Sequence, residues 1–156
     1  MKQKIQIRCK NNKKSQKVEI GSTLFDVFSS FDLKMTHGPV SARVNNKVEG
    51  MNYRVYNSKD VEFLDMNSAS GSRAYTRTLF FVLCKAVQDI YPNTDVVIDI
   101  PVSNGFYVDI RLGRPVVDED VNILRRRMQE IIDSKMPIRR FTVPTEVAIA
   151  LFQGKG

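Results

Sequence analysis

Few side chains in this sequence could support nucleophilic, metal or acid–base chemistry. The 156 residues include one histidine, His37, and two cysteines, Cys9 and Cys84. Structural zinc needs four ligands, so these three residues fall short of a site even if the fold gathers them. A phosphate-binding loop of the form G-x-x-x-x-G-K-[ST] is missing too, because Gly154-Lys155 lacks the earlier glycine and the following hydroxyl. We therefore expect no metal and no cofactor in this chain.

Basic side chains are more abundant than acidic ones in this sequence. Lys and Arg number 24 against 17 Asp and Glu, a formal net charge of +7. Residues 1–66 carry 12 basic and 7 acidic groups, whereas residues 67–156 carry 12 and 10. A concentrated basic surface attracts phosphate polyanions such as RNA. A lysine-rich strand also protects a sheet edge from aggregation, so both interpretations stay open. The candidate nucleic-acid contacts here are Lys10, Lys13, Lys14 and Lys17.

A second basic run occurs late in the chain. Arg125, Arg126 and Arg127 are consecutive, and Arg139 and Arg140 follow. The first three are candidate nucleic-acid contacts as well. Alternatively, they complement the negative end of a helix dipole, with nearby acids balancing their charge.

The composition indicates a folded chain that does not enter a membrane. Hydrophobic residues make up 42% of the sequence, enough for a core. The sequence contains no run of 18 apolar residues, which is about the length that a helix needs to span a bilayer. The opening Met1-Lys2-Gln3-Lys4-Ile5 lacks the apolar stretch of a signal peptide. Free thiols fit a reducing compartment, so we expect a cytoplasmic location.

Small and polar residues divide the chain. The run from Asn67 to Ser72, N-S-A-S-G-S, predicts a flexible linker over 67–72. It separates a domain over 1–66 from a region over 73–156, which we expect to be cut short at its C-terminus.

The first unit has the pattern strand, strand, helix, strand, strand, strand. Alternating apolar residues predict two strands around a turn over 11–14. Thr23 and Asp26 predict a capping box at the start of a short helix. Asn45-Asn46 predicts a tight hairpin. This order is typical of a ubiquitin-like β-grasp.

The second unit is predicted as a second small α+β domain. A wide apolar stripe predicts a long helix ending at Pro92, covered on more than one side. Strands are predicted over 96–100, 105–112 and 138–143. Helices are predicted from Asp118 and from Glu146, and the apolar face of the first comprises Val121, Leu124, Met128, Ile131 and Ile132.

These stretches resemble a known family. Residues 21–27 (GSTLFDV), 42–47 (ARVNNK) and 61–64 (VEFL) resemble a TGS domain, the β-grasp module at the front of threonyl-tRNA synthetase. Residues 85–92 (KAVQDIYP), 104–110 (NGFYVDI) and 148–152 (AIALF) resemble the start of that synthetase's second, editing-type domain. The resemblance implies an α+β fold with a TGS-like β-grasp domain followed by part of an editing-type domain.

The resemblance also implies a cleft that has lost its catalytic groups. The family carries His-x-x-x-His on the first helix of the editing-type domain, where this chain has Arg77 and Phe81. Neither side chain can act as a neutral imidazole. Arg77 could grip a phosphate or carboxylate in a pocket, or lie on the surface. Phe81 is expected to fill the core, and Tyr107 to line a cleft beside Arg77 or to follow a structural turn in which Gly105 supplies a positive φ.

Two functions follow from this resemblance. The first is a non-catalytic binding or regulatory region of a uridine (nucleoside) kinase, because some such kinases resemble the synthetase at their front and lack the editing histidines. ATP would then bind in a kinase domain further along. The alternative is a tRNA- or RNA-binding N-terminal region of a threonyl-tRNA synthetase-like protein. The expected partners are RNA or a small-molecule ligand, plus the kinase domain in the first case, and no membrane.

Overall fold

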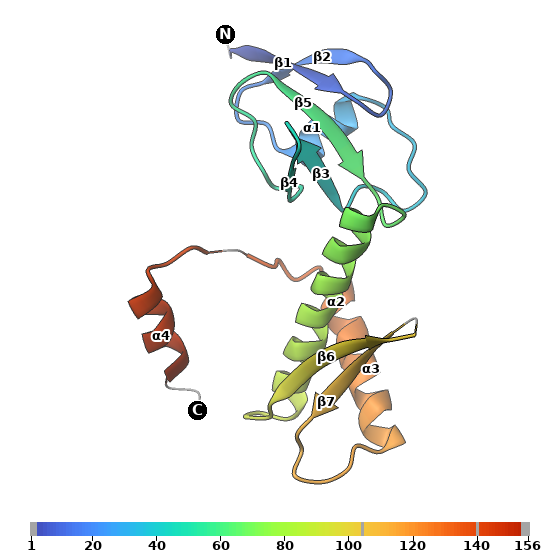
Figure 1. Ribbon diagram of the computed structural model, residues 1–156, viewed down its shortest axis with the longest axis vertical. Helices are drawn as coiled ribbons and strands as arrows, with labels where there is room; N and C mark the ends of the chain where they lie inside the picture. The colour runs from blue at the N-terminus through green and yellow to red at the C-terminus, as the bar shows by residue number, and fades with distance from the viewer. Residues whose placement is uncertain (1–2, 104, 140, 154–156) are drawn as a thin grey trace. The chain divides into compact units, whose positions relative to one another are not determined.

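The structure is a computed structural model that describes residues 3–103, 105–139 and 141–153. Asn104 of the expected turn, Arg140 and Gly154-Lys155 lie outside the described residues, as do Met1 and Lys2. The chain divides into two compact units, one ending at Thr78 and the other beginning at Leu79 (Figure 1).

The first unit is a five-stranded mixed sheet with one helix. Its strands are β1 (Lys4–Cys9), β2 (Ser15–Glu19), β3 (Ser41–Val44), β4 (Lys47–Glu49) and β5 (Lys59–Leu64), in the order β2-β1-β5-β3-β4. β1 and β5 run parallel, and the other pairs are antiparallel. Helix α1 (Leu24–Ser30) lies between β2 and β3 in the chain. The predicted β-grasp order of elements is confirmed.

Local sequence signals explain how these elements begin and turn. The Asp26 amide donates to Thr23 Oγ1 at 3.2 Å and the Thr23 amide donates to Asp26 Oδ2 at 2.8 Å, which is the predicted capping box. Asn45 and Asn46 have φ values of 44° and 72°, a backbone region that Asn tolerates in tight hairpins. The β1–β2 turn likewise places Lys13 at φ 59°.

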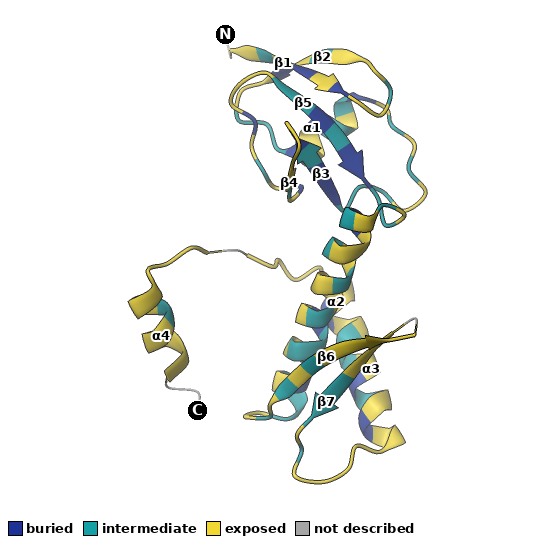
Figure 2. Cartoon of the chain, viewed as in Figure 1, coloured by how far each residue is buried: buried dark blue, intermediate teal, exposed yellow. Residues whose placement is uncertain are grey.

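The core of the first unit lies on the helix side of the sheet. Ile7, Val27 and Phe63 are at most 2% exposed, and the Phe28 and Phe63 rings meet edge to face at 5.1 Å. Figure 2 shows this burial concentrated in the sheet and α1. Full burial of each such side chain contributes roughly 1.5–3 kcal/mol, so this core stabilises the sheet.

The long helix begins earlier than the sequence indicates. α2 spans Ala69–Ile90, so residues 69–72 of the expected linker form its first turn. The Ser68 hydroxyl accepts a hydrogen bond from the Gly71 amide at 3.0 Å, in the manner of an N-cap. Flexibility over 69–72 was therefore the wrong expectation, because a serine next to small residues can also start a helix. The boundaries at 66 and 73 stay predictions.

The second unit has a small core to which two helices and one β-hairpin contribute. α2 and α3 (Asp118–Asp133) contribute Val82, Val87, Leu124 and Ile131, all at most 8% exposed. The hairpin of β6 (Val96–Val102) and β7 (Gly105–Ile110) adds Val96 and Ile110. α4 (Thr145–Gln153) has no buried residue among those described.

Several sequence predictions for the second unit were wrong. The expected strand over 138–143 does not form in its described residues, and Phe141 is 77% exposed, because no neighbouring strand pairs with this segment. Phe81 is 65% exposed, so α2 is not covered on that side and Phe81 does not fill the core of this chain. On α3, Val121 and Ile132 are 43% and 50% exposed, outside the core that Leu124 and Ile131 join.

Candidate nucleic-acid interface

Strand alternation places one row of polar and basic side chains on the outer face of the β1–β2 hairpin. Along β1, Ile7 and Cys9 are buried while Arg8 and Lys10 are exposed. On β2, Lys17 is exposed and its neighbour Val18 is buried. Successive side chains of a strand point to opposite faces, so these cations share the face away from the core. We call the following set the basic sheet face: Lys4, Arg8, Lys10, Lys13, Lys14 and Lys17.

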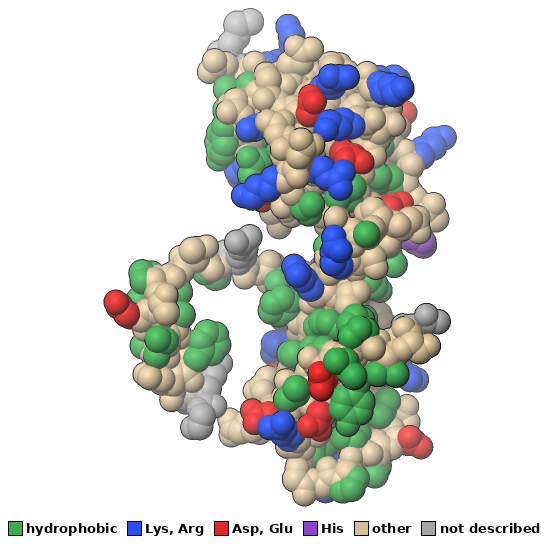
Figure 3. All heavy atoms as spheres, viewed as in Figure 1, with side chains coloured by type: hydrophobic (Ala, Val, Ile, Leu, Met, Phe, Trp, Pro, Cys, Tyr) green, Lys and Arg blue, Asp and Glu red, His purple; other side chains and the backbone are tan. Residues whose placement is uncertain are grey.

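The structure brings the four predicted lysines into one hairpin. Lys10 follows β1, Lys13 and Lys14 lie in the turn, and Lys17 stands opposite Gln6 in register. Lys10 Nζ donates to Asn46 Oδ1 at 3.4 Å. None of the four forms an ion pair within the described residues, and Figure 3 shows lysine and arginine atoms gathered on this part of the first unit. Their charge is therefore available to an anionic ligand.

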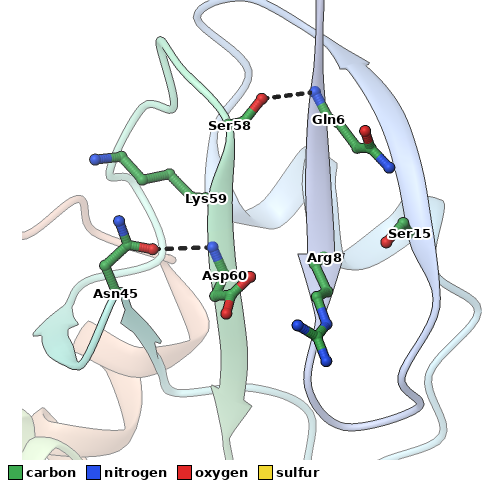
Figure 4. Close-up of a pocket in the computed structure, with 7 residues that line it drawn as sticks. All are labelled: Gln6, Arg8, Ser15, Asn45, Ser58, Lys59 and Asp60. Atoms are coloured by element: carbon green, nitrogen blue, oxygen red, sulfur yellow. Dashed lines mark hydrogen bonds between the residues drawn. The ribbon is translucent and has the colours of Figure 1, made fainter.

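Arg8 belongs to this face although the sequence analysis did not single it out. Its position two residues before Lys10 in an alternating strand is the signal that could have found it. Arg8 also lines a shallow hollow of about 270 Å³, shown in Figure 4. The residues around that hollow are Gln6, Arg8, Ser15, Asn45, Ser58, Lys59 and Asp60.

Two hydrogen bonds shape the rim of this hollow. Asn45 Oδ1 accepts from the Asp60 amide at 2.9 Å, which ties the β3–β4 turn to β5. Ser58 Oγ accepts from the Gln6 amide at 3.4 Å, beside the parallel β1–β5 pair. The hollow is thus framed by backbone of three strands and one turn (Figure 4).

Arg127 in the second unit is paired with nearby acids, in line with the second of the two interpretations given above for the arginine run. Its guanidinium donates through Nε and Nη2 to Asp89 Oδ2 at 3.0 and 2.8 Å, and through Nη1 to Glu130 at 2.9 Å. Glu130 and Asp89 raise the pKa of Arg127, whereas Lys85 and Arg127 lower the pKa of Asp89. Arg127 therefore ties α3 to α2 and has little left to offer a phosphate.

The other two arginines of the run remain exposed. Arg126 lines a hollow of about 430 Å³ next to Asp89 and Glu130, whose charges oppose an anion. Arg125 has no ion pair among the described residues. As nucleic-acid contacts, Arg125 and Arg126 stay predictions.

The start of α3 is held by a buried carboxylate. Asp120, 3% exposed, accepts from Arg114 at 2.7 and 2.8 Å, from the Tyr91 hydroxyl at 2.6 Å and from the Val117 amide at 3.0 Å. Arg114, Tyr91 and the Val117 amide hold the pKa of Asp120 well below its usual range. These bonds fix α3 against the end of α2, so the network is a structural support.

This network predicts a specific acid sensitivity. A carboxyl group whose pKa is lowered by folding stabilises the fold above its unfolded pKa of about 4, and that stability is lost as pH falls toward the folded value. We expect the melting temperature to fall between pH 7 and pH 3, and Asp120→Asn to shrink that fall. Circular dichroism melts at both pH values measure it. Asp118→Asn, at the same helix end, is the control and should retain the full fall; equal falls in both variants contradict the assignment.

The residues of the predicted cleft stay predictions as a ligand pocket, although the structure shows how each of them is placed in its own element. Arg77 and Phe81 are exposed on α2, one in each unit. Phe81 lines a hollow of about 690 Å³ with Cys84, Lys85 and Gln88. Tyr107 lies on the opposite strand face from Phe106, whose ring meets Phe80 of α2 at 4.9 Å, so Tyr107 faces away from that helix.

The expected positive φ at Gly105 is also absent. In the described residues next to this turn, Ser103 has φ 52° and Gly105 has no positive φ. His37 lies exposed in a turn. Among the described residues, no three His, Cys, Asp or Glu side chains are grouped to hold a metal ion, and no helix is long and apolar enough to cross a membrane.

Comparisons with known proteins connect the chain to one kind of enzyme. No protein-family model matches it. It is 29% identical over 141 residues to a threonine–tRNA ligase of Natranaerobius thermophilus, which covers 90% of this chain and 22% of the ligase. The corresponding ligase of Acetivibrio thermocellus is 29% identical over 133 residues, covering 85% of this chain and 21% of the ligase.

A third relative covers almost the whole chain. The threonine–tRNA ligase of Clostridium kluyveri is 27% identical over 151 residues, 97% of this chain and 24% of the ligase. The chain spans about a fifth of the length of these relatives. These relatives favour the hypothesis of a threonyl-tRNA synthetase-like protein over the hypothesis of a nucleoside kinase. Throughout nearly all of its length, this chain is homologous to a segment of threonine–tRNA ligases.

Proposed function

We propose that this chain is the RNA-binding N-terminal region of a threonyl-tRNA synthetase-like protein, and that its first unit acts as a TGS-type module. The basic sheet face would hold a tRNA backbone. The observation that carries the proposal is a set of cations on one hairpin that form no ion pair within the described residues, in a chain similar to ligases named for tRNA.

The proposed mode of binding is electrostatic and positional. Lys10, Lys13, Lys14 and Lys17 would each approach a phosphate and release its condensed counterions. Contacts of this kind orient an RNA without reading its bases. The buried core fixes the backbone of the sheet beneath, so the four lysines start from set positions along the hairpin while their side chains adjust to the phosphates.

We also propose that the chain binds without hydrolysing. Arg77 and Phe81 occupy the positions that hold imidazoles in the family it resembles, and an arginine cannot accept a proton near neutral pH. Both side chains are exposed in this structure. Attachment to a kinase domain gains no support from the relatives named above.

Salt dependence tests the proposal. Four phosphate contacts give a slope of about −3 to −4 in log affinity against log salt, so tRNA affinity should fall about 50- to 150-fold between ~50 and ~200 mM salt. Fluorescence anisotropy with a labelled threonine-accepting tRNA transcript measures this. An affinity that does not change with salt, or no binding at ~50 mM, contradicts the proposal.

A further inference from the structure

The hollow on the sheet face contains two opposite charges that do not pair with each other. Arg8 of β1 and Asp60 of β5 are register partners on adjacent parallel strands. Neither side chain makes a hydrogen bond or an ion pair within the described residues. Figure 4 shows both side chains on the same side of the sheet, with their polar groups in the hollow.

The neighbouring groups do not satisfy Asp60 either. The Asn45 side-chain oxygen is already used by the Asp60 backbone amide, and Ser58 Oγ accepts from Gln6. Glu62, two residues along β5, is different because Arg43 Nη1 contacts its carboxylate at 2.5 Å. Within the part of the chain that the structure describes, Asp60 is therefore a carboxylate without an ion-pair partner, in a hollow that Arg8 and Lys59 also line.

A carboxylate in this position opposes binding by charge alone. A purely electrostatic surface for phosphates gains nothing from Asp60, because like charges repel the polyanion. A carboxylate accepts hydrogen bonds and never donates when ionised, so a ligand that benefits from it must offer a hydroxyl or amino donor next to a phosphate. The 2′-hydroxyl of RNA is such a donor, and DNA has none.

We propose that this hollow is a ribose-phosphate subsite, in which Arg8 contacts a backbone phosphate and Asp60 accepts a hydrogen bond from the 2′-hydroxyl of the same nucleotide unit. The inference rests on the proposed RNA-binding function. The volume of about 270 Å³ suits one sugar-phosphate unit and not a folded helix of RNA. Lys59, also on the rim, adds a second positive charge.

The subsite would select RNA over DNA without reading sequence. With RNA, the hydrogen bond to a charged acceptor offsets the repulsion between Asp60 and the backbone. With DNA, the repulsion remains and the carboxylate loses water without gaining a partner. We expect wild-type protein to prefer RNA about fivefold or more over DNA of the same base sequence.

The test uses twelve-residue oligomers of uridine and of 2′-deoxyuridine, measured by fluorescence anisotropy at ~50 mM salt. Asp60→Ala should weaken RNA binding, strengthen DNA binding and bring the ratio of the two affinities to about one. Glu62→Ala is the matched control on the same strand and face. It also removes one negative charge, but should strengthen binding of both oligomers equally and preserve the ratio.

An unaltered protein gives a second measurement that does not depend on the variant folding. A 2′-fluoro RNA keeps the sugar shape of RNA but cannot donate a hydrogen bond, so its affinity for wild-type protein should fall to the level of DNA. The subsite is contradicted if 2′-fluoro RNA binds as tightly as RNA, or if Asp60→Ala strengthens the binding of both oligomers equally. In either case, salt-dependent tRNA binding would still support the proposed function. If tRNA itself fails to bind, the proposed function is lost, and the subsite with it.

Discussion

Replacing the four hairpin lysines by glutamine is expected to weaken tRNA binding about 100-fold at ~50 mM salt. Each substitution removes one phosphate contact, and four such contacts account for the slope of about −3 to −4 against log salt. The residual slope should be near zero. The substituted residues are Lys10, Lys13, Lys14 and Lys17.

A matched variant separates local contact from net charge. It removes the same number of positive charges from exposed positions outside β1, β2 and their turn. These are Lys34, Arg111, Lys135 and Arg139. We expect this control to lose less than about fivefold, because these four side chains are not among the cations proposed to contact phosphates. Equal losses in both variants would mean that the chain binds RNA through net charge and not through the basic sheet face.

Gly71→Ala is expected to lower the free energy of unfolding of the first unit by about 3 kcal/mol, the upper end of overpacking costs. A Cβ at Gly71 would lie 1.8 Å from the backbone oxygen of Asp65, and backbone cannot swing aside as a flexible side chain can. The same turn holds the Ser68 cap, whose hydroxyl donates to that oxygen at 2.9 Å. Chemical denaturation monitored by circular dichroism measures the loss.

Gly50→Ala is the control for this substitution. A Cβ at Gly50 meets nothing within 4 Å, and Gly50 has no positive φ. Its free energy of unfolding should change by no more than about 0.5 kcal/mol. A similar loss in both variants would show that the close approach of α2 to Asp65 is not what Gly71 provides.

The sequence predicted the first unit well because its signals are local. Alternation in β1, the capping box of Thr23 and Asp26, and the tight turn at Asn45-Asn46 each depend on a few consecutive residues. The prediction of a flexible linker was wrong over residues 69–72. A run of serine, alanine and glycine is compatible with both coil and helix, and the cap that Ser68 provides favours the helix.

The second unit was harder because its structure depends on contacts distant in sequence. An alternating pattern at 138–143 is not sufficient to form a strand when no partner strand pairs with it. The apolar stripe of α2 does not reveal that the Phe81 side chain is exposed. The role of Arg127 depends on Asp89, 38 residues away. A run of arginines in the sequence does not show which of them form internal ion pairs and which are available to bind a ligand.

The candidate interface could be predicted in part. The lysines of the first hairpin are adjacent in sequence, so the hairpin keeps them adjacent in space. Asp60 enters the same surface only through the parallel pairing of β1 with β5, which joins residues about fifty positions apart. The pairing of Arg8 with Asp60 therefore becomes visible only in the folded sheet.

The most direct test of RNA binding by the basic sheet face is a heteronuclear NMR titration of the wild-type chain with tRNA at ~50 mM salt. We expect the largest amide shift changes in β1, β2 and their turn, including Arg8, Lys10 and Lys17. Changes confined to α3 around Arg125 and Arg126, with the hairpin unaffected, would contradict it.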